Sequence, residues 1–181
     1  MKLVILDRDG VINFDSDAYI KSPEEWLPIP GSLEAIARLH RAGFTVTVAT
    51  NQAGVARGLF DLAALDAIHL RMQTAIAQAG GSLAGIFYCP HAPEDGCDCR
   101  KPQPGLLKKI AEQLHVDLHG VPVIGDSLRD IEAAERVGAR PILVLTGSGK
   151  KTLRSLQAPR RVEVFADLAA AADQLVSEVQ S

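Results

Sequence analysis

The fold is decided by Lys2-Leu3-Val4-Ile5-Leu6-Asp7-Arg8-Asp9-Gly10-Val11-Ile12, near the start of the 181-residue chain. An apolar run that ends in a charged turn is typical of a strand covered on both faces. In an extended backbone, Asp7 and Asp9 lie two residues apart and point to the same face. Two ionised carboxylates about 4 Å apart repel by roughly 4 kcal/mol at an effective dielectric of about 20. The pair therefore suggests a cation, and Mg²⁺, which accepts one or two carboxylates and a substrate phosphate, fits.

Composition limits the class of protein. The length fits one domain over residues 1–181. With a net charge of −3 and 19 basic residues spread along the chain, no basic stripe is present, so nucleic acid is not an expected partner. No apolar run approaches the roughly 20 residues of a membrane span, and no signal-peptide pattern precedes the first strand. We expect a cytoplasmic protein, monomeric and away from membranes.

Strand and helix patterns alternate along the whole chain. After the first strand, strand patterns recur at 44–49, 85–88, 121–125, 141–145 and 162–165. Helical spacing of apolar residues occupies 31–43, 61–80, 106–114, 127–137, a short stretch near 151, and 168–179. The alternation predicts an α/β fold, a doubly wound and mainly parallel sheet, with residues 15–31 as an irregular excursion. Ligands bind such sheets at the carboxyl ends of the strands, where Asp7, Thr50 and Asp126 fall.

These strand-end residues, with Asp9 and Lys101, form a consistent set for phosphoryl transfer. A phosphate ester is a dianion, so an attacking aspartate needs the positive charge of Mg²⁺ and Lys101. Thr50 and the amides after it can donate hydrogen bonds to the phosphate. An aspartyl-phosphate intermediate divides hydrolysis into two easier steps, with Asp9 placed as acid and then base.

Each member also has a plainer explanation. The Asp-Gly sequence after the first strand suits an exposed turn, Thr50 a polar strand end, and Lys101 a solvated surface. Ser127 and Asp130 suit a helix N-cap and its capping box, and Asp130 needs no further role. The phosphoryl-transfer interpretation is favoured because strand-end acids recur in order on separate units of one sheet.

The three cysteines, Cys89, Cys97 and Cys99, share one short window with His91. Their odd number and clustering favour metal ligation over disulfides. Cys-x-His, separated by five residues from Cys-x-Cys, offers four ligands of the kind that structural zinc prefers, with no open coordination position. The segment 89–104 is long and unpatterned for a compact domain. We therefore predict a zinc-binding loop at 89–104 that orders the residues immediately after its last ligand.

Four ordered segments resemble the motifs of the haloacid dehalogenase superfamily of phosphatases. They are VILDRDG at 4–10, Thr50 after the second strand, Lys101 within RKPQPG, and GDSLRD at 125–130, and the resemblance spans residues 3–146. Within the superfamily, TNQAGVARG at 50–58 and the cysteine segments resemble the heptose bisphosphate phosphatase branch and its sibling, the histidinol-phosphate phosphatases.

The resemblance implies a role for each position. Asp7 is then the nucleophile and Asp9 the acid/base, magnesium is held by Asp7, Asp126 and the Asp9 carbonyl, and Thr50 and Lys101 hold the phosphoryl group. The residues implied in substrate binding are Asp15, Tyr19, Thr50, Asn51, Gln52, Arg100 and Lys101. The chain departs from the pattern in two places, because Ala53 stands where a serine is usual and the 15–19 segment carries an extra residue.

The implied activity is removal of the 7-phosphate from D-glycero-D-manno-heptose 1,7-bisphosphate, a step of ADP-heptose and lipopolysaccharide core precursor synthesis. No large cap domain is expected. The alternatives are a histidinol-phosphate phosphatase and a non-catalytic module that binds sugar phosphates. Residues 147–152, GSGKKT, look like a nucleotide P-loop, but Val144 and Lys151 stand where glycine and Ser/Thr are required, so we interpret them as a flexible turn.

Overall fold

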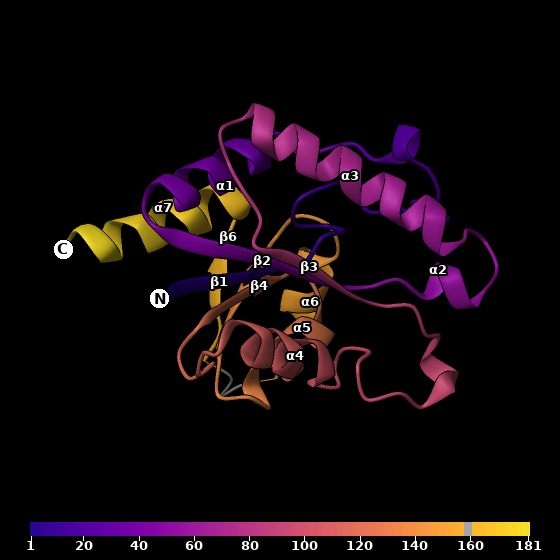
Figure 1. The fold of residues 1–181 in the computed structure, drawn as a ribbon. Coiled ribbons are helices and arrows are strands. Elements are labelled where there is room, and N and C mark those ends of the chain that lie inside the picture. Colours follow the sequence, from indigo (N-terminus) through magenta and orange to yellow (C-terminus); the bar gives the residue numbers. More distant parts are fainter. Residues whose placement is uncertain (158–160) are drawn as a thin grey trace.

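The computed structural model describes residues 1–157 and 161–181, which form a six-stranded sheet flanked by helices (Figure 1). All neighbouring strands are parallel, in the order β3-β2-β1-β4-β5-β6. The strands are Lys2–Leu6 (β1), Phe44–Asn51 (β2), Gly85–Cys89 (β3), Pro122–Gly125 (β4), Arg140–Val144 (β5) and Glu163–Phe165 (β6). The doubly wound parallel sheet predicted from the sequence is confirmed.

Helices cover both faces of the sheet (Figure 1). One core contains residues of α1 (Ser32–Arg41), α3 (Leu62–Gln78) and α7 (Leu168–Gln180), and the other contains residues of α4 (Gly105–Leu114) and α5 (Leu128–Glu135). Short pieces complete the chain: α2 (Ala53–Ala56), α6 (Gly149–Ser155) and the 3₁₀ turns η1 (Pro23–Glu25) and η2 (Pro93–Asp95).

Strand β1 shows why its run of apolar residues is unbroken. Val4 and Leu6 pack into the core under α1 and α3, whereas Leu3 and Ile5 pack into the core under α4. Successive side chains of a strand point to opposite faces, so a central parallel strand needs apolar residues at every position. The apolar side chains on both faces of β1 therefore suit it to the centre of the sheet.

Two local predictions need correction. Residues 147–152 are not a flexible turn, because α6 begins at Gly149 and the Thr152 hydroxyl donates to the carbonyl oxygen of Asp126 at 2.8 Å. The short helix expected near 151 is therefore confirmed. Strand β2 runs two residues beyond the predicted 44–49, because Asn51 still pairs with Cys89 of β3.

The long connections stay irregular, as expected. Residues 15–31 contain the short η1 turn and an isolated bridge at Pro28, and Trp26, directly after η1, is buried. Within the described residues, neither this segment nor the 89–104 loop holds an inserted cap domain. No helix in residues 1–157 and 161–181 has the length and apolar character needed to cross a membrane.

The sheet has a switch point between β1 and β4. The chain leaves β1 toward β2 and β3 on one side and returns to β4 on the other. Crossovers diverge at such a point and leave a crevice at the carboxyl ends of the two strands. Asp7 follows β1 and Asp126 follows β4, so both acids open onto this crevice.

Candidate active site

Three carboxylates meet at the switch point. Asp7 follows β1, Asp126 follows β4 and Asp130 lies in the first turn of α5, and one oxygen from each lies within 4.8 Å of the others. Asp126 and Asp130 are buried and Asp7 is partly buried. Burial, and then the negative charge of Asp130, raises the pKa of Asp7 well above its usual value and that of Asp126 to about 7. The site therefore gathers more negative charge than its own residues neutralise.

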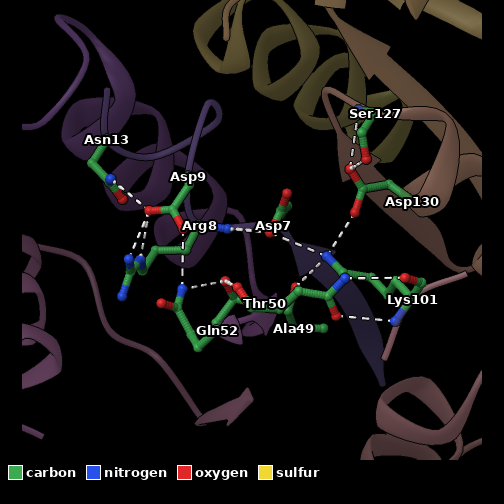
Figure 2. Close-up of polar contacts among 11 residues, drawn as sticks. Asp7, Arg8, Asp9, Asn13, Ala49, Thr50, Gln52, Lys101, Ser127 and Asp130 are labelled. Carbon is green, nitrogen blue, oxygen red and sulfur yellow. Dashed lines mark hydrogen bonds and ion pairs between the residues drawn. The ribbon is translucent and has the colours of Figure 1, made fainter. Parts of the chain in front are cut away.

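Lys101 supplies positive charge to this cluster (Figure 2). Its Nζ lies 3.1 Å from Asp7 Oδ1 and 2.6 Å from Asp130 Oδ1, and it donates to the Ala49 carbonyl oxygen at 2.7 Å. Burial alone opposes the charge, but Asp130 and Asp7 raise the pKa of Lys101 above its usual value. Lys101 in turn holds the pKa of Asp130 below normal against the effect of burial. The Lys101–Asp130 pair is thus charged and fixed beside Asp7.

The Asp126 carboxylate lies in a narrow slot between two glycines. A Cβ added at Gly10 or Gly147 would come within 2.1 or 2.2 Å of Asp126 Oδ2, and both residues have positive φ. The Ser148 N–H donates to the same oxygen at 2.8 Å. Glycine is required at both positions because a side chain would displace the carboxylate. The GSGKKT segment, which the sequence left as a turn, therefore helps hold a predicted magnesium ligand.

Asp9 is held by four hydrogen bonds (Figure 2). Its Oδ1 accepts from Arg8 Nε at 2.9 Å, Arg8 NH2 at 2.7 Å and Asn13 Nδ2 at 2.9 Å. Its Oδ2 accepts from Gln52 Nε2 at 3.0 Å. Its side chain is not part of the three-carboxylate cluster formed by Asp7, Asp126 and Asp130.

Residues at the end of β2 and directly after it form hydrogen bonds with Asp9 and Lys101 of the site. Gln52 Nε2 also donates to Thr50 Oγ1 at 3.0 Å, and Thr50 is almost completely buried. The Asn51 amide binds the backbone of Lys101 twice, because Nδ2 donates to the Lys101 carbonyl and the Lys101 N–H donates to Oδ1, both at 3.0 Å. Asn51 was predicted to bind substrate, and the structure gives its side chain this further contact.

A cavity of about 230 Å³ opens over the carboxylates. The predicted substrate residues Asp15, Tyr19, Asn51, Gln52, Arg100 and Lys101 all line it, whereas Thr50 lies outside the lining. Two unpredicted arginines, Arg57 and Arg129, line it as well. Burial, and then the like charge of Arg129, lowers the pKa of Arg100. The wall of the cavity formed by Arg100 and Arg129 is therefore cationic.

The cysteine loop forms a second cluster. Cys89 at the end of β3, His91, Cys97 and Cys99 place four donor atoms within 4.8 Å of one another. The Cys89 sulfur lies 3.6 Å from that of Cys97 and 2.8 Å from that of Cys99, and His91 Nδ1 lies 3.4 and 3.2 Å from the Cys89 and Cys99 sulfurs. A tetrahedral site with Zn–S bonds of about 2.3 Å has edges of roughly 3.8 Å; the 3.6 Å between the Cys89 and Cys97 sulfurs is close to this, and the 2.8 Å between those of Cys89 and Cys99 is shorter. Three thiols and an imidazole this close together are the donor types that structural zinc prefers.

Sequence reasoning missed several contributors. Asp130 does form the predicted capping box with Ser127, but it is also the nearest partner of Lys101. Its place in GDSLRD, one helical turn after Asp126, was the available signal. Arg57 and Arg129 lie within TNQAGVARG at 50–58 and GDSLRD at 125–130, so their place in these segments was the available signal.

Comparisons with known proteins agree with this geometry. Residues 98–171 match the HAD-hydrolase-like family model. The chain is 59% identical to a D-glycero-β-D-manno-heptose-1,7-bisphosphate 7-phosphatase of Bordetella bronchiseptica over 98% of this chain and 99% of that protein. It is 57% identical to the enzyme of the same name from Pseudomonas putida, over 97% of this chain and all of the relative.

A solved structure shares the fold as well. The crystal structure of D,D-heptose 1,7-bisphosphate phosphatase from B. bronchiseptica, complexed with magnesium and phosphate, matches with a TM-score of 0.96 and 59% identity. The match covers 98% of this chain and 99% of the other. The chain therefore belongs to the family of D-glycero-β-D-manno-heptose-1,7-bisphosphate 7-phosphatases, within the HAD-like hydrolases.

Proposed function

We propose that this protein is a magnesium-dependent phosphatase that removes the 7-phosphate from D-glycero-β-D-manno-heptose 1,7-bisphosphate. The observation that carries the proposal is the meeting of Asp7, Asp126 and Lys101, from three separate segments, at the switch point of the sheet. The names of the relatives support the substrate, and they specify the β anomer, which the sequence alone left open.

The carboxylate cluster fits a divalent cation. Asp7, Asp126 and the Asp9 carbonyl are the residues that would hold it, and the raised pKa values of Asp7 and Asp126 reflect negative charge that such an ion would offset. A bound Mg²⁺ supplies positive charge to the phosphoryl oxygens and lowers the repulsion between the substrate and Asp7. The same ion in the Bordetella structure supports this assignment.

In the first step, an Asp7 oxygen attacks the phosphorus of the 7-phosphate and the bond to the sugar O7 breaks. Lys101 Nζ, 3.1 Å from Asp7, neutralises charge on the transferred group and keeps Asp7 oriented. Asp9 Oδ2, held by Gln52, gives its proton to the leaving oxygen. Asp7 is then an aspartyl phosphate.

In the second step, Asp9 Oδ2 removes a proton from a water molecule, which attacks the same phosphorus. The bond between Asp7 and phosphorus breaks, and inorganic phosphate leaves with Asp7 regenerated. One carboxylate therefore acts as acid and then as base, which requires its oxygen to stay in place between the steps. The four hydrogen bonds on Asp9 meet this requirement.

The second phosphate of the substrate explains the cationic wall of the cavity. Arg57, Arg100 and Arg129 all line the cavity, and Arg100 and Arg129 repel each other. Guanidinium groups bind phosphate through paired N–H donors, so an anion between them relieves the repulsion. A bisphosphate supplies that anion, whereas histidinol phosphate has a single phosphate and carries an ammonium group and an imidazole, so the cationic wall favours the sugar substrate.

The cysteine loop would hold zinc through Cys89, His91, Cys97 and Cys99 in a structural role. Lys101 follows the last of these ligands by two residues. We also infer a monomeric, cytoplasmic enzyme that acts on a small sugar phosphate and serves lipopolysaccharide precursor synthesis. Neither a nucleic acid nor a membrane partner is proposed.

Phosphate release by the purified protein with Mg²⁺ tests the proposal. The β anomer of the heptose bisphosphate, its α anomer and histidinol phosphate are compared at equal concentrations. We expect the highest kcat/KM for the β anomer. A clear preference for histidinol phosphate, or no release from any phosphate ester, would reject the proposed function.

A further inference from the structure

His69 is a buried polar residue of α3 that the proposed mechanism does not use. Its Nε2 lies 3.1 Å from Arg8 NH1, although 61 residues separate the two in sequence. Arg8 itself is completely buried, and its other two bonded nitrogens bind Asp9 Oδ1. The chain of contacts His69–Arg8–Asp9 therefore connects the interior side of α3 to the proposed acid/base.

The chemistry of the contact fixes the state of His69. A guanidinium carries only donors, so Nε2 of His69 accepts the hydrogen bond and the imidazole proton lies on Nδ1. The imidazole is then neutral. Burial, and then the charge of Arg8, lowers the pKa of His69 to about 3, in agreement with this tautomer. Histidine here acts as a hydrogen-bond acceptor for a buried cation.

The orientation of Arg8 in turn determines which Asp9 oxygen can react. Oδ1 accepts three hydrogen bonds, two from Arg8 and one from Asn13, whereas Oδ2 accepts one, from Gln52. A proton that moves to and from substrate must therefore reside on Oδ2. If Arg8 rotated away, Oδ1 would lose two of its three donors and the two oxygens would no longer be distinguished.

We propose that His69 is a positioning residue, whose neutral imidazole anchors Arg8 and thereby keeps Asp9 Oδ2 directed at the oxygen of the leaving group. The inference rests on the proposed function, because it assigns His69 a part in that reaction. The inference leads to an expectation of its own. Loss of the His69 acceptor should weaken acid catalysis at the leaving group and leave the binding of phosphate unchanged.

The test is the dependence of the first step on the leaving group. His69→Met removes the acceptor at similar volume, and His69→Gln restores an acceptor through its amide oxygen. The pre-steady-state burst is measured with the heptose bisphosphate, whose alkoxide needs a proton, and with p-nitrophenyl phosphate, whose phenolate does not. Ile76→Val, a buried change further along α3, controls for loss of packing.

We expect His69→Met to slow the burst with the heptose bisphosphate by roughly tenfold to a hundredfold, a part of the usual contribution of acid catalysis. The burst with p-nitrophenyl phosphate and the KM should change by less than about threefold. His69→Gln and Ile76→Val should behave like the unmodified protein. An equal loss with both substrates, or no loss with either, would overturn the proposal.

A second measurement observes the tautomer of His69 in the unmodified protein and does not require His69→Met to fold. Nitrogen NMR of the unmodified protein, with the His69 signal assigned from the His69→Gln spectrum, reports the tautomer directly. The proposal requires an unprotonated Nε2 and a protonated Nδ1, and a proton on Nε2 would overturn it. Failure of the proposed function is separate, because it would appear as absent phosphate release by the unmodified protein.

Discussion

The carboxylate cluster and the cysteine cluster are both ligand sets, but they are assembled in opposite ways. Asp7 lies far in sequence from Asp126 and Asp130, and the fold brings the three together through β1, β4 and α5. Cys89 ends β3, and His91, Cys97 and Cys99 follow in the same loop, whose one helical element within the described residues is a 3₁₀ turn. The sheet positions the first cluster, whereas the second must position its own loop.

The two clusters also differ in the groups of the chain that neutralise or bind them. The carboxylates already hold Lys101 among them, so part of their charge is offset by the chain itself. Within the described residues, the thiols and His91 share hydrogen bonds mainly with one another and with the backbone of Arg100. We infer that loss of magnesium leaves the first cluster ordered, whereas loss of zinc releases the loop that carries Lys101.

The largest expected effect is that of Asp7→Asn, which removes the nucleophile and leaves its shape. We expect kcat to fall by at least about a thousandfold while inorganic phosphate still binds, because the sheet and Lys101 remain in place. Asp173→Asn, the same chemical change in a surface ion pair with Arg38, is the matched control. Robust turnover by Asp7→Asn would show that Asp7 is not the nucleophile.

Cys97→Ser tests the second cluster. We expect loss of zinc and a fall in kcat of about tenfold to a hundredfold, because displacement of Lys101 by about 1 Å is sufficient for such a loss. Circular dichroism should show an intact fold. Glu94→Gln, an exposed change in the same loop, should retain both zinc and activity. Unaltered kinetics after zinc has been lost would refute the link between the loop and Lys101.

The pH dependence of magnesium binding tests whether a proton competes with the metal at the carboxylate cluster. With a pKa of about 7, Asp126 binds a proton below that pH, and this proton competes with the metal. The affinity for Mg²⁺ should therefore weaken by at least about tenfold for each unit of pH below 7. Calorimetric titration of the metal-free protein measures this, and Asp126→Asn should reduce the slope to the part that comes from Asp7, whose pKa is also raised. A constant affinity between pH 6 and 8 would contradict it.

The smallest expected effect is that of a change at Asn51. Its side chain links the end of β2, beside the carboxylate cluster, to Lys101, which follows the cysteine cluster in sequence. Its amide fastens the backbone of Lys101 to the end of β2 through two hydrogen bonds. Because Lys101 keeps its ion pairs with Asp7 and Asp130, Asn51→Ala should lower kcat only by about threefold to tenfold. Combined with Cys97→Ser, the loss should exceed the product of the single losses, since each anchor still holds the lysine in part when the other has been removed. A double variant whose loss only equals that product would contradict a shared role.

Much of this arrangement could be predicted from sequence, for identifiable reasons. The unbroken run before Asp7 specified a central strand, and Cys-x-His with Cys-x-Cys specified a ligand set, because both signals are local. The partnership of Lys101 with Asp130 could not be predicted, since it depends on where α5 meets the 89–104 loop. The contact of Arg8 with His69 spans 61 residues and gave no local signal. The slot around Asp126 could not be predicted either, because Gly10 and Gly147 come together only in the folded chain.

Direct detection of the phosphorylated residue tests the central claim, that Asp7 itself takes the phosphoryl group. The protein is mixed with Mg²⁺ and the heptose bisphosphate, quenched in acid during the first turnover, digested, and analysed by mass spectrometry. We expect one phosphoryl group on the peptide that contains Asp7, and none on that peptide in Asp7→Asn. A phosphoryl group on another residue, or turnover without any phosphorylated peptide, would contradict it.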